Sequence, residues 1–247
     1  MISKNRISEL RKLHLKKFRD ESRLFIVEGR KSVEMLLASH FAIREILTSE
    51  QFAQSHRSML AEHPVTIVAT SDLERITALN TSPELLAVVE QPRDLGLLND
   101  DVPVVVLDRI ADPGNMGTII RTADWFGIRQ VVCSPDCVEL YNPKTIQATM
   151  GSFCHVKVWY QPLVPFLQKQ RESRRVIGAF LNGESVRSFE FLRNDVLVIG
   201  SESHGISPDV EKCITHRITI PDGNAGAPTA ESLNAGVAAA ILMFQMM

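Results

Sequence analysis

The sequence lacks the signals of several common protein classes. Its first residues, MISKNRISEL, are polar, and its longest apolar run, 237–244, is far too short to span a bilayer. No G-x-G-x-x-G motif follows a strand and no lysine follows a glycine-rich loop, so dinucleotide-binding and P-loop folds have no support. Ser201 and Ser203 lack the G-x-S-x-G context of a hydrolase nucleophile. We therefore expect no membrane segment and none of these three classes of enzyme.

Paired cysteine spacing of the kind that binds a metal is also missing. The cysteines are therefore interpreted as reduced, mostly buried thiols of a cytoplasmic protein, and no metal site is expected. They are Cys133, Cys137, Cys154 and Cys213.

What the chain does have is an ordinary globular composition and an uneven charge. Its 247 residues are 45% hydrophobic and 23% charged, which fits one or two soluble domains with a real core. The net charge is -2, yet residues 1–31 carry ten Lys/Arg against four acids. A basic stripe of this kind is typical of proteins that bind phosphate, although a solvated helix face explains it equally well. The candidate RNA-binding residues in this stripe are Lys4, Arg6, Arg11, Lys12, Lys16, Lys17 and Arg30.

Hydrophobic periodicity predicts two α/β regions. In the first, a helix over 3–19 precedes alternating strands and helices, and Ser71 is a candidate cap for the helix over 71–79. Strands are expected over 24–29, 43–49, 65–70 and 85–92, with helices over 30–39, 51–62 and 71–79. The stretch 93–102 has no periodicity and is rich in turn formers, so it is predicted to be a linker between domains 1–92 and 103–247.

The second region restarts the alternation with a continuous apolar strand over 102–108, of the kind buried in parallel sheets. Further strands are predicted over 130–134, 155–159, 175–180, 196–199 and 218–220. Helices are predicted over 116–126, 142–151 and 164–173, with a last helix opening at 231–232. Glycine-bearing loops follow the strands 196–199 and 218–220, and we expect these two strands to be adjacent and to form a ligand-binding crevice.

Three segments carry candidate chemistry. In 107–128, a strand and a Pro113-Gly114 turn lead into a helix whose first amides can hold an anion, with Asn115 at its mouth and Arg121 two turns further. An ordinary turn with Asn115 as N-cap and Arg121 on the surface explains the same segment. In 200–205, GSESHG, glycines let the backbone approach a ligand closely, and Glu202 can accept a proton or hold a ribose hydroxyl; a plain turn is the alternative.

The third segment is 220–244, IPDGNAGAPTAESLNAGVAAAILMF. Ser232 and Asn234 stand at a helix start, where capping is their commonest task. The helix behind them is apolar almost all round and must be covered on every side, which favours burial in a subunit interface.

Together, the order and spacing of these segments resemble the SpoU (TrmH-like) family of the SPOUT superfamily, which are S-adenosylmethionine-dependent RNA ribose 2′-O-methyltransferases. The resemblance lies in DPGNMGTIIRTADWFG (112–127), IGSESHG (199–205), IP (220–221) with ESLNAGVAAAI (231–241), and NPKTIQATMG (142–151). The N-terminal segments RISELRKL (6–13) and FIVEGRKSVEMLL (25–37) resemble the L30e-like substrate-binding domain found especially in members that act on ribosomal RNA.

This resemblance implies an L30e-like α/β domain followed by a SPOUT α/β domain with a deep trefoil knot, and a homodimer with active sites at its interface. By the same resemblance, the catalytic residues are Asn115, Arg121, Glu202, Ser232 and Asn234. The residues that hold S-adenosylmethionine are Gly200, Glu202, Gly205, Ile220, Pro221, Ser232 and Leu233. The loop 221–230 looks longer than is usual in the family, which affects the donor pocket, and Ser203 stands where members often have glycine.

A ribose 2′-hydroxyl is a poor nucleophile until its proton is removed or polarised, so catalysis is mainly positioning and proton removal. Arg121 is expected to clamp a phosphate and orient the hydroxyl, and Glu202 to fix either Arg121 or the backbone. The expected substrate is ribosomal RNA, with transfer RNA as the alternative substrate. A non-catalytic RNA-binding dimer in ribosome assembly is the alternative function.

Overall fold

The computed structural model of the chain describes residues 2–223 and 230–247, which form two compact units. Unit 1 holds the chain up to Asp94 together with Tyr141–Cys154, and unit 2 holds Leu95–Leu140 and the chain from His155 onward. The polypeptide therefore passes three times from one unit to the other.

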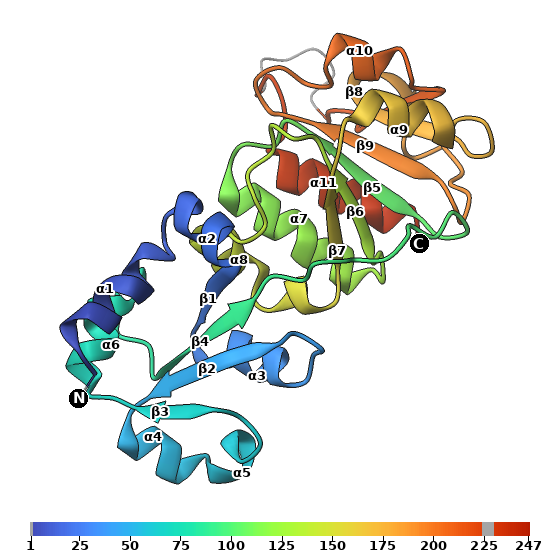
Figure 1. The fold of residues 1–247 in the computed structure, drawn as a ribbon. Helices are drawn as coiled ribbons and strands as arrows, with labels where there is room; N and C mark the ends of the chain where they lie inside the picture. Colours follow the sequence, from blue (N-terminus) through green and yellow to red (C-terminus); the bar gives the residue numbers. More distant parts are fainter. Residues whose placement is uncertain (1, 224–229) are drawn as a thin grey trace. The chain divides into compact units, whose positions relative to one another are not determined.

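Unit 1 is built on a mixed four-stranded sheet in the order β1-β4-β2-β3 (Figure 1). β4 pairs antiparallel with both β1 and β2, whereas β2 and β3 are parallel. The strands are β1 (Leu24–Glu28), β2 (Ile43–Thr48), β3 (Val65–Ile67) and β4 (Leu85–Glu90). The helices are α1 (Lys4–Lys12), α2 (Lys16–Ser22), α3 (Arg30–Leu37), α4 (Glu50–Ser55), α5 (Arg57–Leu60), α6 (Thr70–Ile76) and α8 (Pro143–Thr149), with a 3-10 turn, η1 (Ser152–Cys154). The predicted alternation of strands and helices is confirmed.

Two predicted helices are each broken in two. The single helix expected over 3–19 is wrong, because α1 ends at Lys12 and α2 begins at Lys16. The backbone is extended at Leu15, with φ -102° and ψ 131°, which separates the two helices. Arg19 is 1% exposed and its Nη1 donates to the Leu13 carbonyl at 2.7 Å, so a basic residue of the predicted stripe is used inside the unit. Likewise, the helix expected over 51–62 divides at His56. Ser71 lies within the first turn of α6 rather than at its cap, which is Ala69.

The segment that carries α8 belongs to unit 1 by its packing. The Tyr141 ring lies 4.5 Å from that of Phe25, and Phe153 contacts Phe25 edge-on at 5.9 Å. After α8, Gly151 has a φ of +96°, and a Cβ there would lie 2.5 Å from the Met35 sulfur. This close approach explains why a glycine is required there.

Unit 2 contains a six-stranded sheet in the order β10-β8-β9-β5-β6-β7, and every pairing is parallel. The strands are β5 (Val104–Asp108), β6 (Gln130–Cys133), β7 (Lys157–Tyr160), β8 (Val176–Ser185), β9 (Val196–Gly200) and β10 (His216–Thr219). The predicted parallel sheet is confirmed, but the expected adjacency of the strands near 196–199 and 218–220 is wrong because β8 lies between β9 and β10. β9 instead pairs with β5, which brings the first two candidate segments to neighbouring strands.

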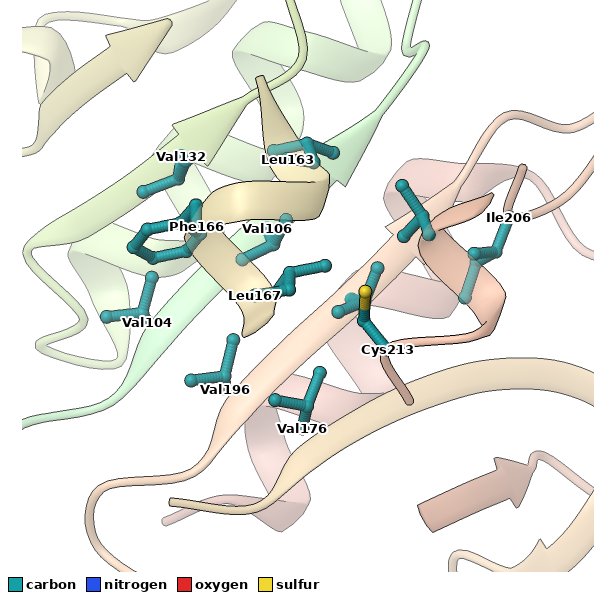
Figure 2. Close-up of a cluster of buried hydrophobic side chains, with 12 residues drawn as sticks. Val104, Val106, Val132, Leu163, Phe166, Leu167, Val176, Val196, Ile206 and Cys213 are labelled. Atoms are coloured by element: carbon teal, nitrogen blue, oxygen red, sulfur yellow. The ribbon is translucent and has the colours of Figure 1, made fainter. Parts of the chain in front are cut away.

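Helices cover both faces of this sheet. Alternate residues of β5, Val104 and Val106, pack against Leu163, Phe166 and Leu167 of α9 (Leu163–Gln170), as Figure 2 shows. The cluster also takes in Val210 of α10 (Pro208–Glu211). The other residues of β5 point to the opposite face, which α7 (Pro113–Trp125) and α11 (Ala235–Gln245) occupy (Figure 1).

All four cysteines are buried and free, as predicted. Within residues 2–223 and 230–247, no helix is long and apolar enough to cross a membrane. Over the same ranges, no group of three or more His, Cys, Asp or Glu side chains is arranged to hold a metal ion.

Candidate functional site

The candidate site lies in unit 2, where two neighbouring strands end. Asp108, the last residue of β5, is paired in register with Gly200, the last residue of β9. The loops that follow both strands, and the chain entering α11, therefore meet at one edge of a parallel sheet. This is the edge at which open α/β sheets bind ligands.

The loop after β5 presents Asn115. Asp112 is the N-cap of α7, its Oδ1 accepting the Asn115 amide at 2.8 Å, and Pro113 occupies the first turn, where its missing N–H costs nothing. The interpretation of Asn115 as the N-cap is therefore wrong. Because Asp112 takes that task, the Asn115 side chain is available for other contacts, and its Nδ2 donates to Glu202 Oε1.

The loop after β9 is a tight turn that presents Glu202. The Gly205 amide donates back to the Ser201 carbonyl at 2.8 Å, and Gly205 has a φ of +60°. A Cβ on Gly200 would lie 2.1 Å from the Gly205 backbone. Both glycines are therefore required by the turn itself, because it folds back against the end of its own strand.

The third contribution comes from the start of α11. Asn234 caps this helix, its Oδ1 accepting the amides of Gly236 at 3.0 Å and Val237 at 3.2 Å. The prediction that Asn234 caps is confirmed, but the helix begins at Ala235 rather than at 231–232. Asn234 Nδ2 also donates to Asn115 Oδ1 at 2.9 Å, and the Ala235 amide donates to Glu202 Oε1 at 3.3 Å.

Asn115, Glu202 and Asn234 thus form one hydrogen-bonded cluster, which we call the amide–carboxylate cluster. Of the two roles expected for Glu202, its bonds fit contact with the backbone and not with Arg121. The N-termini of α7 and α11 both open here, and their positive dipole ends favour a carboxylate at this position. Close packing of the two helices depends on Gly236, where a Cβ would lie 3.2 Å from Thr118 Cγ2.

Two of the predicted catalytic residues stand apart from this cluster. Arg121 is exposed, and within the described residues its guanidinium makes no hydrogen bond or ion pair. Ser232 is exposed just before α11, and its hydroxyl has no hydrogen bond in the described part of the chain. One copy of the chain therefore assembles three of the five predicted catalytic side chains.

The residues predicted to hold the methyl donor lie around the same edge. Gly200 and Gly205 shape the Glu202 turn, Ile220 is half-buried just after β10, and Leu233 is 45% exposed next to the α11 cap. Pro221 is also half-buried. The long loop 221–230 is described only in part, since residues 224–229 lie outside the described residues.

A network behind the cluster was not anticipated from the sequence. Asp108 is 2% exposed and its Oδ2 accepts the Ser207 amide at 2.6 Å. Arg109 has a φ of +59°, an unusual value for a side-chain-bearing residue, and its amide donates to Ser134 Oγ at 2.9 Å. The only sequence signal was an aspartate ending an apolar strand, and nothing marked Arg109.

Cys137 is hydrogen-bonded to the backbone at the end of β5 and in the loop that follows it. Its sulfur accepts the Ile110 amide at 3.2 Å and donates to the Leu107 carbonyl at 3.3 Å. A hydrogen bond from Cys133 lowers the pKa of Cys137 to about 7, although burial opposes the shift. Burial raises the pKa of Cys133 well above its ordinary value. Of the two thiols, Cys137 is therefore the one that ionises more readily.

The basic stripe of unit 1 is more neutralised than its sequence suggests. Four of its candidates form ion pairs, at 2.6 Å for Arg6 with Glu45, 2.6 Å for Lys16 with Asp20, 3.9 Å for Lys17 with Glu21 and 2.7 Å for Arg30 with Glu34. Within the described residues, Lys4, Arg11 and Lys12 have no carboxylate partner. These three are the candidates most available to a phosphate.

Comparisons with known proteins identify the family of the chain. The sequence model described as SpoU rRNA Methylase family matches residues 103–244, and the model of the MRM3-like substrate binding domain matches residues 4–87. The 23S rRNA (guanosine(2553)-2′-O)-methyltransferase RlmP of Bacillus subtilis is 28% identical over 98% of this chain and 95% of its own length. The 23S rRNA (uridine(2479)-2′-O)-methyltransferase of Streptomyces viridochromogenes is 27% identical over 90% of this chain and 81% of its own.

Solved structures are similar over the whole chain. A putative RNA methyltransferase of the TrmH family from Porphyromonas gingivalis is 34% identical with a TM-score of 0.87, covering 100% of this chain and 98% of that one. The SpoU methyltransferase AviRb from Streptomyces viridochromogenes, in complex with AdoMet, is 25% identical with a TM-score of 0.86, covering 99% and 97%. With the family model matching more than half of its length and the N-terminal model matching most of the rest, the chain belongs to the SpoU rRNA methylase family.

Proposed function

We propose that the protein transfers a methyl group from S-adenosylmethionine to a ribose 2′-hydroxyl of ribosomal RNA. The observation that carries this proposal is the amide–carboxylate cluster, in which three chain segments far apart in sequence meet at one edge of the sheet. Relatives named as 23S rRNA 2′-O-methyltransferases, and a similar structure in complex with AdoMet, support the reaction, the substrate class and the methyl donor.

The residues present fit the methyl donor. Ile220 and Leu233 offer partly exposed apolar surface, and they lie in segments outside helices and strands, where backbone groups are not consumed by regular hydrogen bonding. Apolar walls with a few backbone donors and acceptors are typical of cofactor sites. When bound, S-adenosylmethionine supplies a methyl group already activated by its sulfonium.

The protein's own residues then have to orient the hydroxyl and assist loss of its proton. Asn115 and Asn234 are amides that are already fixed, because Glu202 and the α11 cap hold them. They orient the ribose. Arg121 clamps the adjacent phosphate, for which a planar guanidinium is well suited, but it is too basic to act as the base itself. Ser232 lies next to Asn234 and contributes a further hydroxyl to sugar binding.

Arg121 reaches the reacting ribose from a second copy of the chain. It stands four residues before Trp125 on α7, so the two side chains share one face of the helix, and Trp125 is 85% exposed. Phe244 of α11 is 62% exposed and its ring lies 6.0 Å from that of Phe126. Exposed aromatic side chains on two helices that pack together are typical of an interaction site, and we propose that this face is the homodimer interface.

The fold is proposed to include the deep trefoil knot that is characteristic of the SPOUT superfamily. The packing of α11 against α7, at the glycine contact of Gly236, supports a terminal helix held inside unit 2. The proposed domain limits are 1–92 and 103–247, joined by the linker 93–102, with an L30e-like N-terminal domain that binds RNA through Lys4, Arg11 and Lys12.

The reaction is tested with the unaltered protein, and the shared site is tested with two single variants and their mixture. Purified protein is incubated with methyl-labelled S-adenosylmethionine and ribosomal RNA, and the RNA is digested to look for a 2′-O-methylated nucleoside. The variants Arg121→Ala and Asn115→Ala are each expected to be inactive. Mixed as unfolded and refolded chains, they are expected to recover roughly a quarter of the activity, because half of the dimers then hold one intact site. No methylation by the unaltered protein would favour the non-catalytic RNA-binding alternative.

A further inference from the structure

The Glu202 turn is held from outside by one buried carboxylate. Asp108 Oδ2 accepts the Ser207 amide at 2.6 Å, and this amide belongs to the residue two positions after Gly205. Asp108 is only 2% exposed and ends β5, one of the most deeply buried strands of the sheet. The core therefore fixes the position of Asp108, and its hydrogen bond to Ser207 restrains the turn.

Arg109 completes this brace. Its Nη2 lies 3.4 Å from the Gly205 carbonyl, and its Nε lies 3.7 Å from Asp108 Oδ1. The residue adopts a φ of +59°, which costs a side-chain-bearing residue free energy and is far cheaper for glycine. A strained arginine in a loop that leads to the site is the kind of outlier from which a functional role is inferred.

We propose that Asp108, braced by Arg109, is a positioning residue that holds the turn 201–207 so that Glu202 faces Asn115 and the start of α11. Neither residue belongs to the set predicted to touch substrate or donor. Their role in turnover rests on the proposed methyl transfer, whereas their effect on the turn does not.

Asp195 provides a matched control at the other end of β9. It too is fully buried, its Oδ2 accepts a loop amide, that of Leu192, at 2.6 Å, and it pairs with Arg175 at 2.6 Å. Asp195→Asn therefore removes the same kind of buried charge at the start of the neighbouring strand β9, but the loop that it holds does not carry Glu202.

The experiment compares Asp108→Asn, Arg109→Gly and Asp195→Asn by hydrogen exchange, melting temperature and methyl-transfer kinetics. Asp108→Asn and Arg109→Gly are expected to speed amide exchange in 201–207 and at Ala235 about 10-fold, and to lower kcat about 10-fold with KM for RNA within about 2-fold, a coupling typical of residues in one network. Arg109→Gly is expected to keep or raise the melting temperature, because it relieves the positive φ.

Asp195→Asn is expected to lower the melting temperature while exchange in 201–207 and kcat stay unchanged. Equal effects of all three variants on kcat, or unchanged exchange in 201–207 for Asp108→Asn, would overturn the proposal. Hydrogen exchange does not depend on turnover. If the protein lacks the proposed activity, the exchange difference in 201–207 still appears; if Asp108 does not hold the turn, that difference is absent.

Discussion

Replacing Asn234 by aspartate separates two tasks that this side chain performs at once. Its Oδ1 caps α11 through Gly236 and Val237, and its Nδ2 donates to Asn115. Aspartate keeps an oxygen for the cap but has no N–H to donate. Asn115 would then face carboxylates on both sides, at Glu202 and at position 234, with one amide group to serve them.

Loss of the helix cap and loss of the hydrogen bond to Asn115 affect different quantities, the melting temperature and kcat. Loss of an N-cap costs about 1 kcal/mol, which for a domain of this size lowers the melting temperature by about 2–4 °C. Asn234→Ala should show that loss, whereas Asn234→Asp should not, since asparagine and aspartate cap about equally well. The bonds of the cluster are accessible to water, and loss of one such hydrogen bond costs about 0.5–1.5 kcal/mol. If the cluster must be intact in the transition state, kcat falls about 2- to 13-fold in both variants.

Thermal melting and labelled methyl transfer to ribosomal RNA measure the two quantities separately. Asn142 provides a control, because it caps α8 by accepting the Lys144 amide at 2.9 Å and belongs to no cluster at the site. Asn142→Asp should leave both quantities unchanged. Activity of Asn234→Asp within about 2-fold of the unaltered protein would refute the reasoning, since the cluster would then be dispensable for turnover.

Three further predictions follow from features outside the cluster. Phe244→Glu places a charge in the proposed dimer interface and should give a monomer by light scattering; a dimer of unchanged stability would place the interface elsewhere. Arg11→Ala should weaken RNA binding and reduce its salt dependence by about one ion, whereas Lys16→Ala, which removes a lysine already paired with Asp20, should have a smaller effect; equal effects would argue against the availability of Arg11. The pKa of Cys137 is lowered to about 7, whereas an unfolded thiol has a pKa of about 8.5. Ionisation of Cys137 therefore adds to the free energy of unfolding, fully above about pH 8.5, and this contribution is lost as pH falls through 7. The free energy of unfolding in urea should therefore rise from pH 7 to 9 more steeply in the unaltered protein than in Cys137→Ser, and parallel curves would contradict this.

Periodicity located β5, β6 and β9 well because each is a short buried run, mostly apolar. It failed where tertiary contacts decide the outcome. Nothing in the residues around Leu13 signals a helix break, and the bond from the buried Arg19 to the Leu13 carbonyl comes from the next helix. Strand order is a similar case: β8 lies between β9 and β10, and no local pattern encodes that crossover.

In the candidate site too, residues that a sequence pattern marks were predicted, and those that depend on tertiary contacts were not. Asn115, Glu202 and Asn234 were recognisable because their types and spacing match a family pattern, and their mutual hydrogen bonds are consistent with that pattern. The division of capping between Asp112 and Asn115 was not recognisable, because both residue types cap helices equally well and only the backbone decides which one does. Asp108 was missed because a carboxylate at the end of an apolar strand looks like a boundary, and its partner amide is 99 residues away.

The packing of Tyr141–Cys154 with unit 1 has a consequence for truncation and for swapping of domains between relatives. A fragment starting at Leu95 would retain Tyr141 and Phe153 but not Phe25, whose ring contacts both. Conversely, a fragment ending at Asp94 would expose Phe25 and Met35 to water. The linker 93–102 divides the sequence at a different place from the packing, because Tyr141–Cys154 packs in unit 1. Neither half is therefore expected to fold fully by itself. A chimaera joined in the linker would carry aromatic side chains whose packing partners come from a different relative.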